Sequence, residues 1–131
     1  MKKLIVDFDN TISVTYKGDY SNSKPVLELI EQLKKYKSEG FYIVIQSARN
    51  MRTYEGNLGQ INKYTLPIMI EWLAKYEVPY DEILVGKPWC GFNGFYIDDS
   101  AIRPTEFMSK SFEEITAMLK EEKEKITALC K

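Results

Sequence analysis

The chain contains no histidine, and this absence removes several kinds of catalytic site. Hydrolases that pair serine or cysteine with a histidine base, phosphohistidine phosphatases and two-histidine metal sites are all excluded. The two cysteines, Cys90 and Cys130, lack the spacing of a zinc site, and without histidine a cysteine–histidine zinc site is excluded as well. Any catalysis must therefore use carboxylates, lysine or a metal ion held by oxygen atoms.

Long apolar runs and an excess of one charge are also missing. Only Leu4, Ile5 and Val6 precede the first aspartate, whereas the apolar core of a signal peptide needs at least about seven residues. We therefore expect a cytoplasmic protein with no membrane partner. The formal net charge is −1, which argues against a protein that binds nucleic acid by neutralising phosphates.

Length and periodicity together predict one α/β domain over residues 1–131. Strands that alternate with helices indicate a parallel sheet with helices on both sides and right-handed crossovers. We expect four strands, at 4–6, 41–46, 82–85 and 94–97. We expect a hairpin over 12–23, a helix from Pro25 to Gly40, a long loop over 50–64, a helix capped by Thr65 and a last helix that begins at Ser111.

Two aspartates follow the first predicted strand. Asp7 stands at the strand end, and alternation along an extended chain points Asp7 and Asp9 to the same side. Two carboxylates this close imply a bound cation, a shared proton, or both. A strand followed by a simple turn, with Asp9 or Asn10 capping the bend, is the alternative.

The later strands also end in polar groups, namely Ser47, Lys87 and the pair Asp98 and Asp99. Because the carboxyl ends of parallel strands meet at one edge of a sheet, these groups should converge with the first two aspartates. The set suits phosphoryl transfer through an aspartyl-phosphate. Taken singly, Ser47 also fits a strand-end cap, Lys87 a surface lysine and the aspartate pair a turn.

These motifs, in this order, resemble those of the haloacid dehalogenase (HAD) superfamily of phosphatases. DFDNT, which begins at Asp7, matches the first motif, Ser47 the second, Lys87 in VGKP the third, and Asp98 and Asp99 in IDD the fourth. The resemblance implies a three-layer Rossmann-like fold with a central parallel sheet. It also implies a β-hairpin flap after the first strand and no cap domain, because the gaps between motifs hold only a hairpin and a loop.

The resemblance assigns catalytic roles to the first three motifs. Asp7 would be the nucleophile and Asp9 the general acid and base. Ser47 and Lys87 would bind the phosphoryl group, with Lys87 also neutralising the Asp7 anion, and Thr11 would orient the loop near the substrate.

The resemblance also implies Mg²⁺ as cofactor. Asp7 and the backbone carbonyl of Asp9 would bind the ion, with Asp99 as a further direct ligand. Asp98 would contact Lys87 or a water on the metal, although the order of these two aspartates is open.

Further side chains are candidates for binding the rest of the substrate. Arginines suit a second anionic group such as a uronate or another phosphate, and Arg49, two residues after Ser47, is the strongest candidate. Two of the asparagines also fit a purely structural role in satisfying the loop backbone. The candidates are Arg49, Arg52, Tyr54, Asn57, Asn62, Lys63, Trp89 and Arg103.

The phrases SARNMRTYEGNLGQINKYT, GKPWCGFNGFYIDD and AIRPTEF resemble a small subgroup found among bacterial capsule and lipopolysaccharide biosynthesis proteins. This resemblance implies a phosphomonoesterase acting on a phosphorylated sugar or sugar-linked small-molecule intermediate of capsular polysaccharide biosynthesis. Without a cap, the catalytic edge is open to a bulky substrate unless the second subunit of a homodimer covers it. A polynucleotide or protein phosphatase, and a catalytically idle binding module in a biosynthetic complex, stay open as alternatives.

Overall fold

The computed structural model describes residues 2–130. These residues form two compact units that divide between Trp89 and Cys90. The first unit contains all the strands and three α-helices, and the second contains two further helices. That the whole chain forms a single domain stays a prediction.

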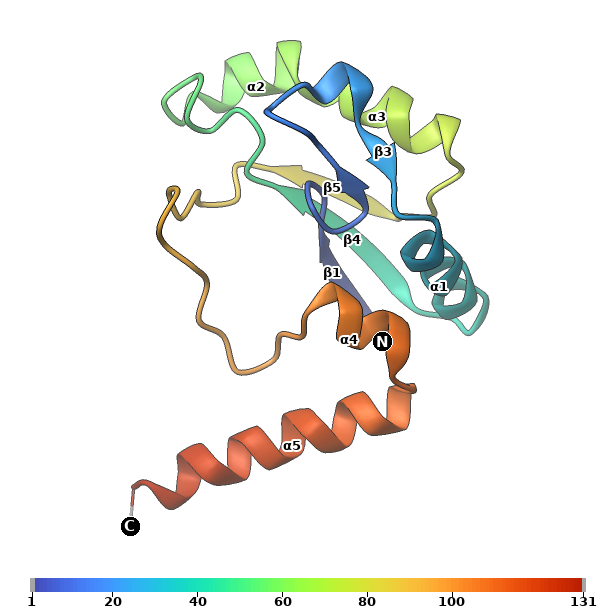
Figure 1. The fold of residues 1–131 in the computed structure, drawn as a ribbon, viewed down its shortest axis with the longest axis vertical. Coiled ribbons are helices and arrows are strands. Elements are labelled where there is room, and N and C mark those ends of the chain that lie inside the picture. Colours follow the sequence, from blue (N-terminus) through green and yellow to red (C-terminus); the bar gives the residue numbers. More distant parts are fainter. Residues whose placement is uncertain (1, 131) are drawn as a thin grey trace. The chain divides into compact units, whose positions relative to one another are not determined.

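A parallel three-stranded sheet forms the centre of the first unit (Figure 1). Its strands are β1 (Lys3–Asp7), β4 (Tyr42–Ser47) and β5 (Glu82–Val85), in the order β1-β4-β5. Asp7 pairs in register with Gln46, and Ser47 pairs with Val85, so the three carboxyl ends lie abreast. The predicted α/β class and the first three predicted strands are confirmed.

Two amphipathic helices bury apolar faces in this unit. Helix α1 (Leu27–Ser38) buries Leu29, Ile30, Leu33 and Tyr36. Helix α3 (Leu66–Lys75) buries Met69 and Leu73. Together with the buried residues of the central strand β4, these side chains form the core that fixes the strand ends.

Part of the predicted loop over 50–64 is helical, so that prediction is wrong from residue 58 onward. Helix α2 (Leu58–Tyr64) begins where the Asn57 side chain accepts a hydrogen bond from the Gln60 backbone N–H, and it buries Ile61. The cap and one buried apolar residue outweigh the low helix propensity of Gly59. Thr65 stands at the N-cap position of α3, as predicted, but its side chain makes no capping hydrogen bond, because its hydroxyl donates to the Asn50 side chain at 2.7 Å.

Residues 13–25, which we call the flap, follow the first strand. Strands β2 (Ser13–Val14) and β3 (Lys24–Pro25) pair antiparallel, with the short 3₁₀ helix η1 (Tyr20–Asn22) between them. The predicted hairpin is therefore present but wider, and Pro25 belongs to β3 rather than to α1. The Trp72 indole N–H donates to the Ser23 carbonyl at 3.1 Å, which attaches the flap to α3.

The second unit contains α4 (Pro104–Ser109) and α5 (Phe112–Ala128). The predicted start at Ser111 is confirmed, because its hydroxyl accepts from the Glu114 N–H at 3.1 Å. The fourth predicted strand, at 94–97, is wrong, since these residues form no regular structure. This unit contains no other described strand with which the segment would pair, so β propensity alone does not order it.

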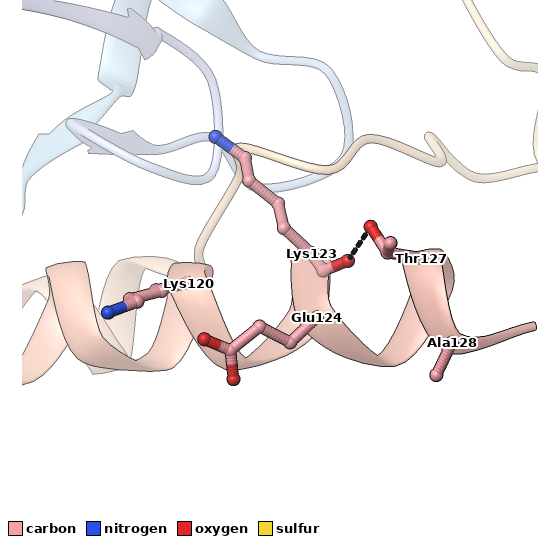
Figure 2. Close-up of a pocket in the computed structure, with 5 residues that line it drawn as sticks. All are labelled: Lys120, Lys123, Glu124, Thr127 and Ala128. Atoms are coloured by element: carbon pink, nitrogen blue, oxygen red, sulfur yellow. Dashed lines mark hydrogen bonds between the residues drawn. The ribbon is translucent and has the colours of Figure 1, made fainter.

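One face of α5 is slightly hollowed, but it has none of the features of a ligand site. Its side chains spread outward without converging on a common point, as Figure 2 shows, and the Thr127 hydroxyl donates to the Lys123 carbonyl within the same helix. None of the predicted site residues lines this surface, which is formed by Lys120, Lys123, Glu124, Thr127 and Ala128. Among the described helices, none has the length and apolar character needed to cross a membrane.

Candidate active site

Asp7, the last residue of β1, is held by one cation and one hydroxyl. The Lys87 ammonium donates to one carboxylate oxygen, Oδ1, at 3.2 Å. The Thr11 hydroxyl donates to the other, Oδ2, at 3.4 Å. Asn10 adopts a left-handed conformation, with φ of 61°, which turns the chain so that Thr11 comes back toward the strand end. Asp7, Thr11 and Lys87 therefore lie together at the end of β1.

Lys87 reaches Asp7 because of a sharp turn at the end of β5. Gly86 has a φ of +84°, a conformation that a side chain disfavours, and a Cβ there would lie 2.7 Å from a methyl carbon of Leu58 on α2. After the turn, the Lys87 backbone N–H donates to the Ser47 carbonyl at 3.0 Å. Residues from β1, β4 and β5 are thereby brought to one edge of the sheet.

The pKa of the Asp7 carboxyl is raised above its ordinary value. Burial is the main cause, because it disfavours the charged form, and the nearby negative charge of Asp9 acts in the same direction. Lys87 opposes both effects through its positive charge and its hydrogen bond. Asp7 is therefore a partly desolvated carboxylate whose charged form depends on a neighbouring cation, which is the environment a carboxylate nucleophile needs.

Asp9 is bound by an arginine that sequence reasoning assigned elsewhere. The Arg49 guanidinium donates two hydrogen bonds to its carboxylate, from Nε to Oδ2 at 3.0 Å and from Nη2 to Oδ1 at 2.7 Å. The Thr15 hydroxyl of the flap donates to the same Oδ1 at 3.2 Å. The Arg49 backbone N–H donates to the Ser47 hydroxyl at 2.9 Å, so the second motif and the arginine form one connected turn.

The Arg49 side chain lies inside the unit and not at its surface. Only 3% of it is exposed, and the guanidinium carbon lies 4.7 Å from the ring centre of Phe8 and 4.2 Å from that of Tyr20. This differs from the expectation of a substrate-reading arginine, because the anion that it binds here is Asp9 of the same chain. Tyr20 and Thr15 were not among the predicted site residues. The sequence feature that could have identified them as site residues is their position in the flap, which directly follows the first motif.

The other predicted substrate-binding residues are spread over both units. Asn57 caps α2, which is the kind of structural role considered for it as the alternative to substrate binding. The Tyr54 ring stacks on that of Tyr64, with ring centroids 6.0 Å apart. Arg52, Asn62, Lys63 and Trp89 are exposed in the first unit. Arg103 precedes α4 in the second unit, where its backbone N–H donates to Glu106 at 2.9 Å. A role in substrate binding stays a prediction for this set.

Asp98 and Asp99 belong to the second unit, and both are exposed. The Asp98 carboxylate accepts from the Ser100 backbone N–H at 2.8 Å, which is the turn geometry considered as their alternative role. Over residues 2–130, no group of three or more acidic or cysteine side chains is arranged to hold a metal ion. That the pair joins Asp7 at a magnesium site stays a prediction.

The chain was also compared with known proteins and solved structures. No protein-family model and no curated protein matches the chain. A crystal structure of a Vibrio cholerae protein, described only as an MCSG target, is 61% identical in sequence, with a TM-score of 0.91. The match covers 93% of this chain and 99% of the other. The chain belongs to the same family as this Vibrio cholerae protein.

Proposed function

We propose that this protein is a Mg²⁺-dependent phosphomonoesterase of the HAD type that works through an aspartyl-phosphate on Asp7. The observation that carries the proposal is the Asp7–Lys87 pair beside Ser47, at the abreast ends of three parallel strands. A partly desolvated carboxylate, an ammonium and a hydroxyl together supply a nucleophile and two groups that bind phosphoryl oxygens. The chain's lack of histidine fits a mechanism that uses carboxylates, lysine, a hydroxyl and a metal ion held by oxygen atoms.

In the first step a carboxylate oxygen of Asp7 attacks the phosphorus of the substrate. A bond forms between that oxygen and phosphorus, the bond from phosphorus to the leaving oxygen breaks, and Asp9 gives a proton to the leaving alcohol. Lys87 and Ser47 bind the phosphoryl oxygens, so that negative charge on them is stabilised as the transfer proceeds.

In the second step water attacks the phosphorus of the aspartyl-phosphate. Asp9, now a carboxylate, accepts a proton from this water, and the bond between phosphorus and the Asp7 oxygen breaks. Inorganic phosphate leaves, Asp7 returns as a carboxylate, and Asp9 is again protonated. The step needs no further reactant, so the cycle closes on hydrolysis of a phosphate monoester.

The donor set of the first unit is compatible with magnesium. Mg²⁺ prefers oxygen ligands, keeps several waters and is usually bound by one or two carboxylates together with substrate phosphate. The Asp7 carboxylate and the Asp9 backbone carbonyl are donors of this kind. When bound, the ion supplies positive charge that offsets the repulsion between Asp7 and an anionic phosphate.

The substrate class rests on the resemblance of the chain to capsule biosynthesis proteins. We propose a phosphorylated sugar or sugar-linked small molecule of capsular polysaccharide assembly, in the cytoplasm. The residues between the second motif and α2 include exposed polar groups suited to such a substrate, Arg52 among them. Release of inorganic phosphate from a panel of phosphorylated sugars, polyols and amino alcohols identifies the organic part.

Metal removal tests the reaction class. The purified protein should release nitrophenol from para-nitrophenyl phosphate, and EDTA should lower the rate to the background level, because the charge of the ion is then missing and Lys87 alone opposes the repulsion between Asp7 and the anionic substrate. Adding excess Mg²⁺ after EDTA is the control and should restore the rate. If the wild type releases phosphate neither from para-nitrophenyl phosphate nor from any member of the substrate panel, the idle binding module would be favoured.

The role of Asp9 can be tested through the leaving group. Asp9→Asn should lower the turnover of phenyl phosphate by about 10²–10⁴-fold, because that leaving oxygen needs a proton. Turnover of para-nitrophenyl phosphate, whose leaving group is more stable as an anion, should fall less. The measurement is kcat for both esters in both proteins, and equal losses on the two esters would contradict the acid role.

A further inference from the structure

A buried ion pair connects the predicted acid to the second motif and to the flap. Arg49 follows Ser47 by two residues, and its guanidinium binds both carboxylate oxygens of Asp9, at 3.0 Å and 2.7 Å. With 3% of its side chain exposed, Arg49 has little contact with water. A charge in this position is stable only when paired, so the geometry of one partner fixes that of the other.

The guanidinium is also enclosed by two aromatic rings. Phe8 directly follows β1 and stands between Asp7 and Asp9 in the chain. Its side chain is fully buried, so its ring forms a fixed surface against the arginine. Tyr20 belongs to the flap, and its ring centre lies 4.2 Å from the guanidinium carbon. Cation–π attraction favours a guanidinium at this distance from a ring, and it joins a flap residue to the cation that holds Asp9.

A second contact from the flap reaches the same carboxylate directly. The Thr15 hydroxyl donates to Asp9 Oδ1 at 3.2 Å, and it also lies 2.8 Å from the Ser23 hydroxyl across the flap. The two strands of the flap and the indole bond to Ser23 therefore support the same oxygen that Arg49 binds. The flap and the arginine act on Asp9 from two sides.

We infer that Arg49 is a positioning residue for Asp9, and that Tyr20 keeps Arg49 in place from the flap. This inference rests on the proposed function, since it assigns Arg49 to proton transfer by Asp9 and not to recognition of the substrate's organic part. Without Arg49 or the Tyr20 ring, the Asp9 carboxylate keeps the hydroxyl contacts from Ser13 and Thr15 on one oxygen but loses the two-pronged contact that fixes its orientation toward the leaving oxygen. The effect then concentrates on reactions that need the proton.

The leaving-group dependence of kcat separates positioning from substrate recognition. Arg49→Met and Tyr20→Leu should each lower kcat for phenyl phosphate by about 100-fold and for para-nitrophenyl phosphate by about tenfold or less, with KM little changed. Tyr20→Phe keeps the ring and should retain the wild-type rates. The double variant should be no slower than Arg49→Met alone, because both changes remove the same constraint.

Two results would overturn the inference. One is an Arg49→Met protein with a raised KM and an equal loss of rate for both esters, which is the signature of a group that binds substrate. The other is additive losses in the double variant. Arg49→Lys, which keeps the charge but loses the two-pronged contact, should show the same leaving-group trend if Arg49→Met does not fold.

Trypsin cleavage gives a readout that does not depend on activity. Lys17 is exposed in the flap, so its rate of cleavage reports how firmly the flap is held. Arg49→Met, Tyr20→Leu and Asp9→Ala should all be cut there several-fold faster than wild type, because each removes part of one connected cluster. Tyr20→Phe should be unchanged, and so should Lys34→Met, which removes only a surface pair with Glu31.

Equal cleavage at Lys17 in wild type, Arg49→Met and Asp9→Ala would overturn the inference even in an inactive protein. A different result is also possible: the wild type has no phosphatase activity, but the three variants are still cleaved faster than wild type. The proposed function would then fail, while the connection of Asp9, Arg49 and Tyr20 would stand. Cleavage after Lys17 is followed by intact mass over time at fixed trypsin concentration.

Discussion

Replacing Asp7 with asparagine is expected to lower phosphatase turnover by about 10⁴-fold or more, because an amide does not form the acyl-phosphate intermediate. The loss should be the same for good and poor leaving groups, in contrast to Asp9→Asn. The measurement is single-turnover release of nitrophenol and phenol. Asp7→Ala is the matched second variant, since deamidation of asparagine would restore some aspartate.

The same substitution should not weaken folding at neutral pH. Burial raises the Asp7 pKa above its ordinary value, so the folded state binds the proton more tightly than the unfolded state does. The resulting contribution to stability is fully present below the unfolded pKa and is lost as the pH rises through the folded pKa. The difference in Tm, Asp7→Asn minus wild type, should therefore be larger at neutral pH than at acid pH. The opposite trend would show that Lys87 outweighs burial.

Lys87→Met is the second change with a large expected effect. Its ammonium donates to Asp7 at 3.2 Å and is placed to bind a phosphoryl oxygen, so its removal should lower kcat by about 10²–10³-fold. In the metal-free protein the pKa of Asp7 should rise further, because a positive charge and a hydrogen bond that both lower it are lost.

Carbon-detected NMR of aspartate-labelled protein in EDTA measures this shift directly. Lys34→Met is the control, because it removes an exposed lysine that pairs with Glu31 and should leave the Asp7 titration unchanged. An Asp7 pKa that stays the same or falls in Lys87→Met would contradict the pairing on which the site is built.

The strands that form the site were predictable because their signals are local. Short β-branched runs bounded by polar residues predicted β1, β4 and β5, and parallel pairing then placed Asp7, Ser47 and Lys87 at one edge. The sequence was less informative where a segment becomes a strand only if a neighbouring strand is available to pair with it. The run at 94–97 has strong β propensity, but Phe95 and Ile97 are 77% and 90% exposed and no strand forms.

Arg49 shows why the finer design of the site was beyond sequence reasoning. Its position two residues after Ser47 is compatible with either a substrate-reading group or an internal ion pair. The choice depends on Asp9, Phe8 and Tyr20, which lie far from it in the chain and meet it only after folding. Helix α2 was not predicted because the burial of Ile61, which stabilises it, depends on contacts that form only in the folded chain.

Detection of a phosphoryl group on Asp7 tests the central claim most directly. Wild-type protein mixed with excess aryl phosphate and Mg²⁺, then quenched in acid within one turnover, should carry one phosphoryl group on the tryptic peptide from Leu4 to Lys17. Fragmentation should place the group on Asp7 and not on Asp9, and Asp7→Ala should remain unmodified. Turnover without any phosphorylated Asp7, or a phosphoryl group found on another residue, would contradict the account.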